Sequence, residues 1–298
     1  MKENDTWTPP RLVKWISQDF KNRGFPPPHR LEAEYLVSHC LNISRLDIYL
    51  QYDKPCSLEE RERLRELVKR RQKREPLAYI IGEFYFWTLV LFVGSGVLVP
   101  RQDTEILVEE AVNLIPDEER DSQYCILELG TGSAAIPLAI SMERKNIHIT
   151  TIEKYSPALG FAKKNLIKYK QEISKNHNQI LMVQGDKFHA IQNHPFFDMI
   201  ISNPPYIPER DIGDLQEEVR SWEPKDALSG GNKGLDFYQY LKNQAESLLK
   251  PGGILIFEHG YHQKQQILEL FEPSTTLKIH KSTKDYSNND RVLGYKKQ

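Results

Sequence analysis

Apolar side chains recur at every third or fourth position through residues 1–75, a spacing that predicts amphipathic helices. The first helix is expected to bury Leu12, Val13, Ile16 and Phe20. Gly24 and the prolines at 26–28 end this run, because neither residue type readily continues a helix. Ser57 and Glu60 have the spacing of a capping box, so another helix is expected to begin there.

Between residues 76 and 100 the pattern changes to that of short strands. Apolar runs at 79–81, 84–87 and 97–99 are separated by Gly82 and by a second pair of glycines. Aromatic and β-branched runs that are punctuated by glycine are typical of hairpins. A β-hairpin linker is therefore expected over 76–100.

Beyond Pro100, apolar runs of strand length alternate with helical patterns. The expected strands are 125–129, 148–152, 180–184, 199–201 and 254–257. Such alternation predicts a mostly parallel sheet with helices on both faces, closed by an antiparallel hairpin from 276–282 and 291–295. The chain is thus expected to form a helical domain over 1–75, the linker over 76–100 and an α/β domain over 101–298.

Composition and charge narrow the class of protein. Hydrophobic residues make up 39% of the 298 residues and charged residues 27%, so the chain can bury a sizeable core. There are 40 Lys and Arg against 41 Asp and Glu, a balance that argues against binding mainly through nucleic-acid phosphates. The basic helix face around 69–74 fits either a solvated surface or a docking surface.

Several features point to a cytoplasmic protein without a metal. Three distant cysteines fit a reducing compartment. The polar start Met1–Asp5 leads into no apolar run, so no signal peptide is expected. No stretch approaches the roughly 20 apolar residues that span a membrane. His259 and His262 have no third ligand in sight, so no metal site is expected.

A glycine-rich turn follows the strand at 125–129, and it consists of Gly130, Thr131, Gly132, Ser133 and Ala134. Glycines let the backbone approach a ligand closely. Glu153 follows about 20 residues later, where a carboxylate can accept the ribose hydroxyls of a nucleotide. This pattern fits a nicotinamide cofactor nearly as well as S-adenosylmethionine. Glu128 and Asp186 favour S-adenosylmethionine, because they suit a methionine ammonium and an adenine amino group.

The tetrapeptide Asn203-Pro204-Pro205-Tyr206 ends the strand at 199–201. Proline cannot continue a central strand, and it holds the preceding residue extended. The Asn203 side-chain oxygen and the Pro204 carbonyl can therefore accept from one NH₂ group, beside an aromatic wall from Tyr206. This geometry predicts direct in-line methyl transfer to an amide or exocyclic amine, with no metal or covalent intermediate.

With these motifs, the sequence resembles the release-factor glutamine methyltransferases, the HemK/PrmC family, over nearly its whole length. The matching stretches are 74–80 with Gly82, 98–101 with Thr104-Glu105, 129–133, 202–207, Glu223-Pro224 with Ala227-Leu228, Gly230-Gly231 and 290–292. The resemblance implies a Rossmann-like class I methyltransferase domain preceded by a small helical domain that docks the substrate. It also implies methyl transfer from S-adenosylmethionine, with S-adenosylhomocysteine as product, to the glutamine of the Gly-Gly-Gln loop of peptide chain release factors in translation termination.

The resemblance also implies the site residues. By position, the cofactor-binding residues are Gly130, Thr131, Gly132, Ser133, Ala134, Glu153, Asp186, Lys187 and Asn203. The catalytic residues are Asn203, Pro204, Pro205 and Tyr206. The sequence departs from the family's usual pattern at Ala134, where glycine is frequent, at Glu153, where aspartate is more usual, and at Lys187, where an aromatic residue can occur.

Other functions remain as alternatives. An N6-adenine methyltransferase acting on DNA or RNA has related chemistry, but it would normally need a basic surface. A sister enzyme could methylate a glutamine of a ribosomal protein, although Thr104-Glu105 after Pro100-Arg101 favours the release-factor branch. A nicotinamide-dependent dehydrogenase would leave the tetrapeptide at 203–206 unexplained. A catalytically silent binding module for translation factors is the fourth alternative.

Overall fold

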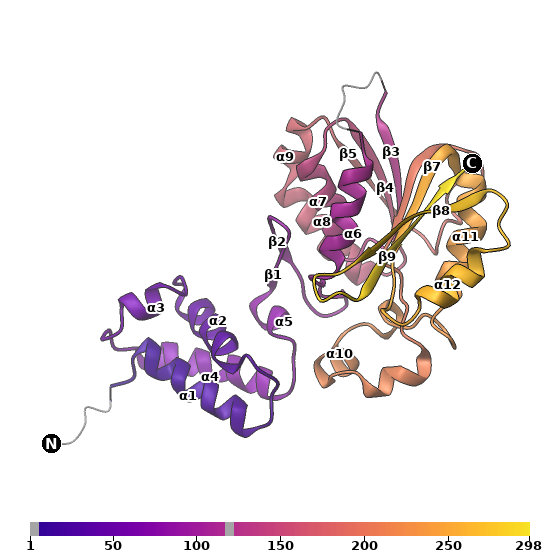
Figure 1. Cartoon of the computed structure of the whole chain (residues 1–298). Coiled ribbons are helices and arrows are strands. Elements are labelled where there is room, and N and C mark those ends of the chain that lie inside the picture. Colours follow the sequence, from indigo (N-terminus) through magenta and orange to yellow (C-terminus); the bar gives the residue numbers. More distant parts are fainter. Residues whose placement is uncertain (1–5, 117–121) are drawn as a thin grey trace. The chain divides into compact units, whose positions relative to one another are not determined.

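The computed structural model describes residues 6–116 and 122–298, and the chain divides into two compact units (Figure 1). The helical unit comprises Met1–Gly82 and Glu217–Trp222, and the sheet unit comprises Glu83–Gln216 and Glu223–Gln298. The start Met1–Asp5, on which the expectation of no signal peptide rests, lies outside the described residues. In the part of the chain that is described, no helix is long and apolar enough to cross a membrane.

The helical unit is built from amphipathic helices that share one apolar core. Its helices are α1 (Pro9–Asn22), α2 (His29–Leu41), α3 (Asp47–Leu50), α4 (Leu58–Gln72) and α5 (Leu77–Ile81). The predicted apolar face of α1 is buried, with Ile16 and Phe20 fully enclosed. The predicted capping box is also confirmed, because Ser57 and Glu60 bond reciprocally at the start of α4.

Two of the three strands predicted between 76 and 100 are wrong. Residues 79–81 belong to α5, which begins after Pro76 and ends at Gly82, where φ is +83°. Residues 97–99 join no ladder, because the Val99 amide donates instead to the Glu223 carboxylate at 3.3 Å. The predicted hairpin does form from β1 (Glu83–Phe86) and β2 (Leu89–Phe92).

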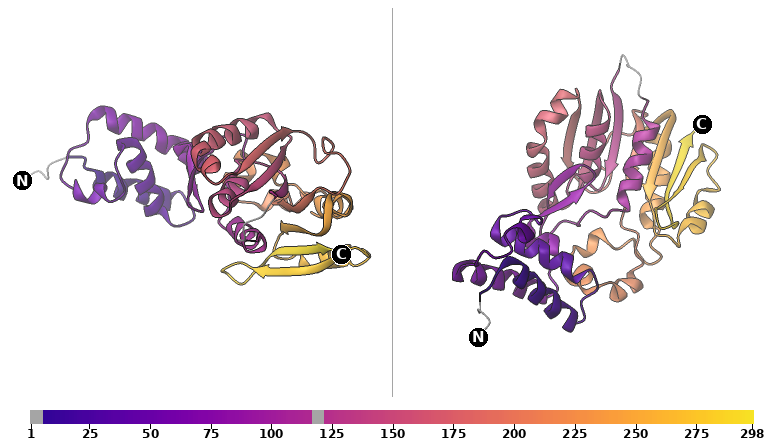
Figure 2. Two further views of the ribbon diagram at one scale, coloured as in Figure 1. Left: turned by 90° about the horizontal axis from the view of Figure 1, so that it is seen from above. Right: turned by 60° about the vertical axis from the view of Figure 1, so that its left-hand side comes forward.

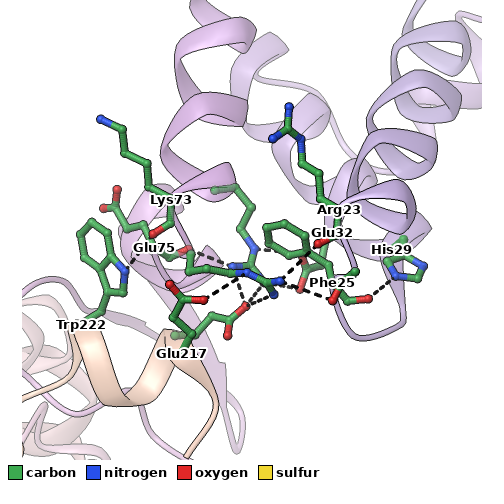
Figure 3. Close-up of polar contacts among 12 residues, drawn as sticks. Arg23, Phe25, His29, Glu32, Lys73, Glu75, Glu217 and Trp222 are labelled. Atoms are coloured by element: carbon green, nitrogen blue, oxygen red, sulfur yellow. Dashed lines mark hydrogen bonds and ion pairs between the residues drawn. The ribbon is translucent and has the colours of Figure 1, made fainter.

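The short helix α10 (Glu217–Trp222) packs within the helical unit, although it is distant in sequence (Figure 3). The buried Arg71 guanidinium donates to Glu32 Oε2 at 2.9 Å and to Glu218 Oε1 at 3.1 Å. Trp222 Nε1 donates to the carbonyl of Lys73 at 3.2 Å. The chain therefore leaves the sheet unit after residue 216 and returns to it at residue 223.

The sheet unit contains the predicted sheet, with the order β5-β4-β3-β6-β7-β9-β8. Its strands are β3 (Tyr124–Leu129), β4 (Ile147–Glu153), β5 (Gln179–Gln184), β6 (Phe197–Ser202), β7 (Leu249–Glu258), β8 (Leu277–Lys284) and β9 (Asp290–Lys297). Strands β5 to β7 in this order are parallel, and β9 pairs antiparallel with both β7 and β8. The predicted C-terminal hairpin is thus confirmed, and it is drawn in yellow in Figure 2.

Helices cover both faces of this sheet and bury its alternating side chains. They are α6 (Thr104–Leu114), α7 (Ala135–Glu143), α8 (Ser156–Lys168), α9 (Lys170–Lys175), α11 (Asp236–Leu248) and α12 (Lys264–Phe271), with short 3₁₀ turns at Glu209–Asp214 and Lys225–Ala227. On β3, Ile126 joins the core beneath α6 and α7, whereas Leu127 joins the core beneath α11 and α12. This three-layer arrangement leaves the carboxyl edge of the parallel strands for a site.

Candidate active site

The glycine turn and the tetrapeptide meet where the strand order reverses. The chain runs outward from β3 to β4 and β5, and then returns to place β6 on the other side of β3. Leu129 and Ser202 are direct partners at the ends of β3 and β6, and Ser202 Oγ donates to the Leu129 carbonyl at 2.8 Å. Ligands bind at such switch points in open α/β sheets.

The glycine turn has a backbone shape that admits a ligand. Gly130 has φ +88°, and a Cβ added there would lie 4.0 Å from the Asn203 carbonyl oxygen. The Gly132 amide donates to Glu153 Oε2 at 2.9 Å, and Glu153 Oε1 accepts from the Tyr155 amide at 2.9 Å. Glu153 therefore anchors the turn from the end of β4. Ala134 is the N-cap residue before α7 and has φ +65°, a conformation that glycine adopts without strain.

Glu128 lies fully enclosed beside this turn. The Thr151 hydroxyl donates to Glu128 Oε2, and the Thr131 hydroxyl contacts Thr151 at 2.6 Å. Glu128 Oε1 is buried and has no hydrogen-bond partner in the protein. Burial raises the pKa of Glu128 to about 8, although the Thr151 hydrogen bond works in the opposite direction. A buried carboxylate oxygen without a partner fits a ligand that brings an ammonium group.

The two residues predicted to flank an adenine follow β5. Asp186 is half exposed and pairs with Lys154 Nζ at 3.3 Å. Lys187 has φ +55°, and its Nζ lies 4.7 Å from the centre of the Tyr240 ring and 5.6 Å from that of Phe237. This lysine therefore packs on aromatic side chains of α11 at the position where the family can carry an aromatic residue. The adenine role of both residues stays a prediction.

The side chains of the tetrapeptide are held by residues that the sequence reasoning did not place in the site. Asn203 Nδ2 donates to Thr104 Oγ1 at 2.9 Å, and the Thr104 hydroxyl donates to Glu258 Oε2 at 2.7 Å. The Tyr206 hydroxyl donates to Glu258 Oε1 at 3.2 Å, and burial raises the pKa of this phenol. Thr104 lies in a stretch that matches the family, and Glu258 directly follows a predicted strand. Neither observation predicted that the two side chains form a hydrogen bond.

The backbone after the tetrapeptide is fastened by a strap from residues 228–234. The Ile207 amide donates to the Leu228 carbonyl and the Gly230 amide donates back to Ile207, both at 2.9 Å. A Cβ on Gly230 would lie 2.7 Å from the Pro205 carbonyl oxygen, so only glycine fits this close approach. Gln263 Nε2 adds a hydrogen bond to the Tyr206 carbonyl at 2.9 Å. The matching Ala-Leu-x-Gly-Gly stretch thus fixes the loop.

Another matching pair fixes the segment that leads to Thr104. Arg101 pairs with Glu223 Oε1 at 2.7 Å, and the Glu223 side chain is 2% exposed. Burial raises the pKa of Glu223 even though the Arg101 charge lowers it. The Pro-Arg and Glu-Pro stretches, which are far apart in sequence, therefore meet in the sheet unit.

Beside Tyr206, the sheet unit has a groove of about 1340 Å³. Its lining includes Pro208, Leu235, Tyr261, Gln263 and Arg291. A cavity of this size can admit more than one side chain of a bound segment. Over residues 6–116 and 122–298, no group of three or more His, Cys, Asp and Glu side chains could hold a metal ion.

The strand order, with β9 antiparallel between β7 and β8, the switch-point site and the glycine turn are those of a Rossmann-like methyltransferase. A family model described as the methyltransferase small domain matches residues 104–218, and one described as the PrmC N-terminal domain matches residues 11–82. The chain belongs to the release factor glutamine methyltransferase family. It is 35% identical to the release factor glutamine methyltransferase of Geobacter sulfurreducens, over 97% of each chain.

Other relatives support this family, and a solved structure shares the fold. The release factor glutamine methyltransferase of Shewanella oneidensis is 38% identical over 88% of this chain and 87% of its own, and that of Rhodopirellula baltica is 34% identical over 99% and 98%. The solved hMettl16 catalytic domain superimposes with a TM-score of 0.52 over 69% of this chain and 75% of that chain. At 13% identity, this last likeness shows the fold alone.

Proposed function

We propose that this protein transfers a methyl group from S-adenosylmethionine to the side-chain amide nitrogen of the glutamine in the Gly-Gly-Gln loop of peptide chain release factors. The observation that carries the proposal is the direction of the Asn203 carboxamide. Its Nδ2 donates to Thr104, which leaves Oδ1 to accept from a substrate NH₂ group. The names of the relatives support the glutamine of a release factor as the substrate.

The cofactor would be held along the edge from β3 to β5. The turn 130–134 and the unpartnered Glu128 oxygen suit the methionine part, and Glu153 at the end of β4 suits the ribose. Asp186 and Lys187 would flank the adenine, and Asn203 would lie beside the methyl group. When it is bound, S-adenosylmethionine supplies an electrophilic methyl group on a sulfonium.

The protein's own contribution is orientation. Asn203 Oδ1 and the Pro204 carbonyl would accept both amide hydrogens, so that the nitrogen lone pair points along the line of transfer. The Tyr206 ring would pack on the amide plane, and Pro205 would keep the chain out of the sheet. Orientation of this kind can contribute up to about 7–11 kcal/mol to lowering the barrier. No buried base is required, because the nitrogen loses its proton readily once it is alkylated.

We also propose that the helical unit docks the release factor in the cytoplasm, without direct need for nucleic acid. This unit exposes large apolar side chains that its own core does not use, among them Leu46, Leu50, Tyr52 and Leu58. Exposed apolar side chains of this size are suited to a protein partner. The near-neutral formal charge of -1 also favours a protein over a nucleic acid.

The first experiment measures transfer of labelled methyl groups to a whole release factor, its Gln→Ala loop variant, a short Gly-Gly-Gln peptide and duplex DNA. We expect label in the intact factor and in the peptide only. Asn203→Ala should lower the turnover number by at least about 100-fold, because the aligned acceptor is lost. Its affinity for S-adenosylhomocysteine and its melting temperature should stay close to those of the wild type.

Each substrate arm also carries a contrary outcome. Label in DNA would replace the proposal by an adenine methyltransferase, and label in the Gln→Ala variant would exclude the loop glutamine. Full activity of Asn203→Ala would remove its assigned role. Equal kcat/KM for the whole factor and the peptide would contradict docking by the helical unit.

A further inference from the structure

Glu258 is the last residue of β7. Its ionisable side chain is fully buried, although the residues before it on the strand are apolar. The proposed reaction does not use it directly. Both oxygens of its carboxylate are nevertheless engaged, Oε2 by the Thr104 hydroxyl at 2.7 Å and Oε1 by the Tyr206 hydroxyl at 3.2 Å. The buried Glu258 carboxyl therefore has two hydrogen-bond donors, and one of them, Tyr206, belongs to the tetrapeptide.

The direction of these hydrogen bonds determines how Asn203 points. A carboxylate only accepts, so the single hydroxyl proton of Thr104 is committed to Glu258. The Thr104 oxygen can then act only as an acceptor toward Asn203, and it receives Nδ2 at 2.9 Å. The Asn203 carboxamide has therefore one favoured orientation, with Oδ1 turned away from Thr104.

We propose that Glu258 is a positioning residue that acts through Thr104, so that Asn203 presents its oxygen and never its NH₂ group to the substrate amide. The inference rests on the proposed function in one respect, namely that Asn203 Oδ1 is the acceptor for this amide. The orientation itself depends only on the buried hydrogen bonds of the sheet unit.

The protonation state of Glu258 decides whether this relay keeps its direction. A protonated Glu258 can donate to Thr104, which frees the Thr104 proton for Asn203 and favours the flipped carboxamide. Burial raises the pKa of Glu258 to about 7, while the hydrogen bond from Thr104 and the charge of Arg291 work to lower it. The oriented form is thus the one above this pKa, and it is lost as the pH falls.

The charged and titratable groups around Glu258 come from several elements. Those that act on it are Asp103 before α6, Tyr206 after β6, Tyr238 of α11 and Arg291 of β9, and His259 follows it in the chain. Arg291 is itself paired with Asp285 at 2.9 Å and with Asp103 at 3.0 Å, so its charge is shared. Burial lowers the pKa of His259.

The test compares pH profiles of the turnover number from pH 5.5 to 8.5, with saturating S-adenosylmethionine and the short Gly-Gly-Gln peptide. We expect the wild-type rate to fall with an acid limb near the Glu258 pKa of about 7. Glu258→Gln should lack this limb and keep, at every pH, a rate close to the one that the wild type reaches at low pH, because its carboxamide can donate to Thr104 as a protonated carboxyl does.

A second pair of variants keeps the test independent of Glu258. Thr104→Val removes the relay hydroxyl and should lower the turnover number by about 10–100-fold, with the affinity for S-adenosylhomocysteine unchanged. Thr104→Ser retains the hydroxyl and should restore most of the rate. A wild-type rate for Thr104→Val, or an acid limb that persists in Glu258→Gln, would overturn the proposal.

A readout without turnover separates this inference from the proposed function. In protein labelled with ¹⁵N at asparagine, the side-chain NH₂ signal of Asn203 is the one that Asn203→Ala lacks. We expect it to titrate near pH 7 in the wild type and not in Glu258→Gln. A signal that does not titrate in the wild type contradicts the relay. Absence of any methyl transfer to release factors would instead defeat the proposed function, while the titration still tests the relay.

Discussion

Two buried glutamates at the carboxyl edge of the sheet, Glu128 at β3 and Glu258 at β7, have closely similar surroundings on one side. Each receives a threonine hydroxyl, from Thr151 and Thr104 respectively, and each threonine is bonded to a further polar side chain. They differ on the other side. Glu128 Oε1 has no partner, whereas Glu258 Oε1 receives the Tyr206 hydroxyl.

This difference indicates that Glu128 is suited to bind a ligand, whereas Glu258 is suited to orient the side chains that donate to it. Leaving a buried carboxylate oxygen bare is costly, so it persists where a bound group completes it. Glu258 has both oxygens engaged by side-chain hydroxyls, and it fixes the directions in which Thr104 and Tyr206 donate. The pKa values follow the same order, since burial raises that of Glu128 to about 8 and that of Glu258 to about 7.

The largest effect should come from neutralising Glu128, the glutamate that has an oxygen without a partner, and it should appear in the affinity for the cofactor product. Glu128→Gln should weaken binding of S-adenosylhomocysteine by about 10–100-fold, because the acceptor for the ligand's ammonium loses its negative charge. In the wild type, affinity should rise from pH 6 to 7.5 as Glu128 approaches its pKa of about 8 and carries more negative charge. The ligand's own ammonium stays protonated over this range, so the change in affinity reports Glu128. Calorimetric titration measures both effects.

The matched control for this variant is Glu110→Gln. Glu110 is also buried, but its carboxylate already has Lys281 Nζ at 2.9 Å and the Thr283 hydroxyl at 2.8 Å. Its substitution should leave the affinity unchanged. Equal affinity of Glu128→Gln and the wild type at every pH would show that the bare oxygen does not meet the ligand.

Tyr206→Phe leaves Glu258 Oε1 without its donor, so that the Glu258 carboxyl then resembles that of Glu128. It keeps the aromatic ring and removes the donor to Glu258 Oε1, a hydrogen bond that lowers the Glu258 pKa. The pKa should rise, and the acid limb of the turnover number should move to higher pH by about 0.5–1 unit. The pH profile of peptide methylation measures this shift.

Tyr238→Phe is the control for that shift. The Tyr238 hydroxyl donates to the backbone carbonyl of Glu258 at 3.1 Å and does not touch the carboxylate. The limb should therefore stay in place. A limb that moves equally in both variants would mean that it reports general loosening of the core and not the Tyr206 hydrogen bond.

The glycine turn and the tetrapeptide could be located from the sequence, whereas the hydrogen bonds behind Asn203 could not, for a physical reason. The glycine turn and Glu153 can be recognised from local sequence, because a few neighbouring residues determine a backbone with positive φ and the end of a strand. The tetrapeptide was likewise readable, since proline must end the strand. These are elements whose cause lies within a few residues.

The relay behind Asn203 had no such local cause. Thr104 and Glu258 are separated by 154 positions and meet only because β7 lies beside β6 and α6 packs on the sheet. The capture of α10 by Arg71 spans 147 positions in the same way. At 79–81, the apolar run suited a strand, but Pro76 and Gly82 delimit a helix that the tertiary core stabilises.

The smallest effect should be on stability, where Gln substitutions at the two glutamates can be compared directly. Burial raises the pKa of each folded carboxyl above its ordinary 4.5, so the stability from protonation is complete below that value. It is lost as the pH rises to about 8 for Glu128 and to about 7 for Glu258. At pH 8.5 and without ligand, Glu128→Gln should therefore raise the melting temperature by about 2–6 °C.

Glu258→Gln should raise the melting temperature less than Glu128→Gln does. The pKa of Glu258 lies nearer the ordinary value, and the substitution removes a carboxylate that has two hydrogen-bond donors. At pH 5, both differences from the wild type should shrink, since the wild-type glutamates are then mostly protonated in the folded state. Thermal melting at the two pH values measures this. A larger rise for Glu258→Gln than for Glu128→Gln, or rises that do not depend on pH, would mean that the bare oxygen of Glu128 carries no penalty in the free protein. The contrast between the two glutamates would then be one of geometry alone.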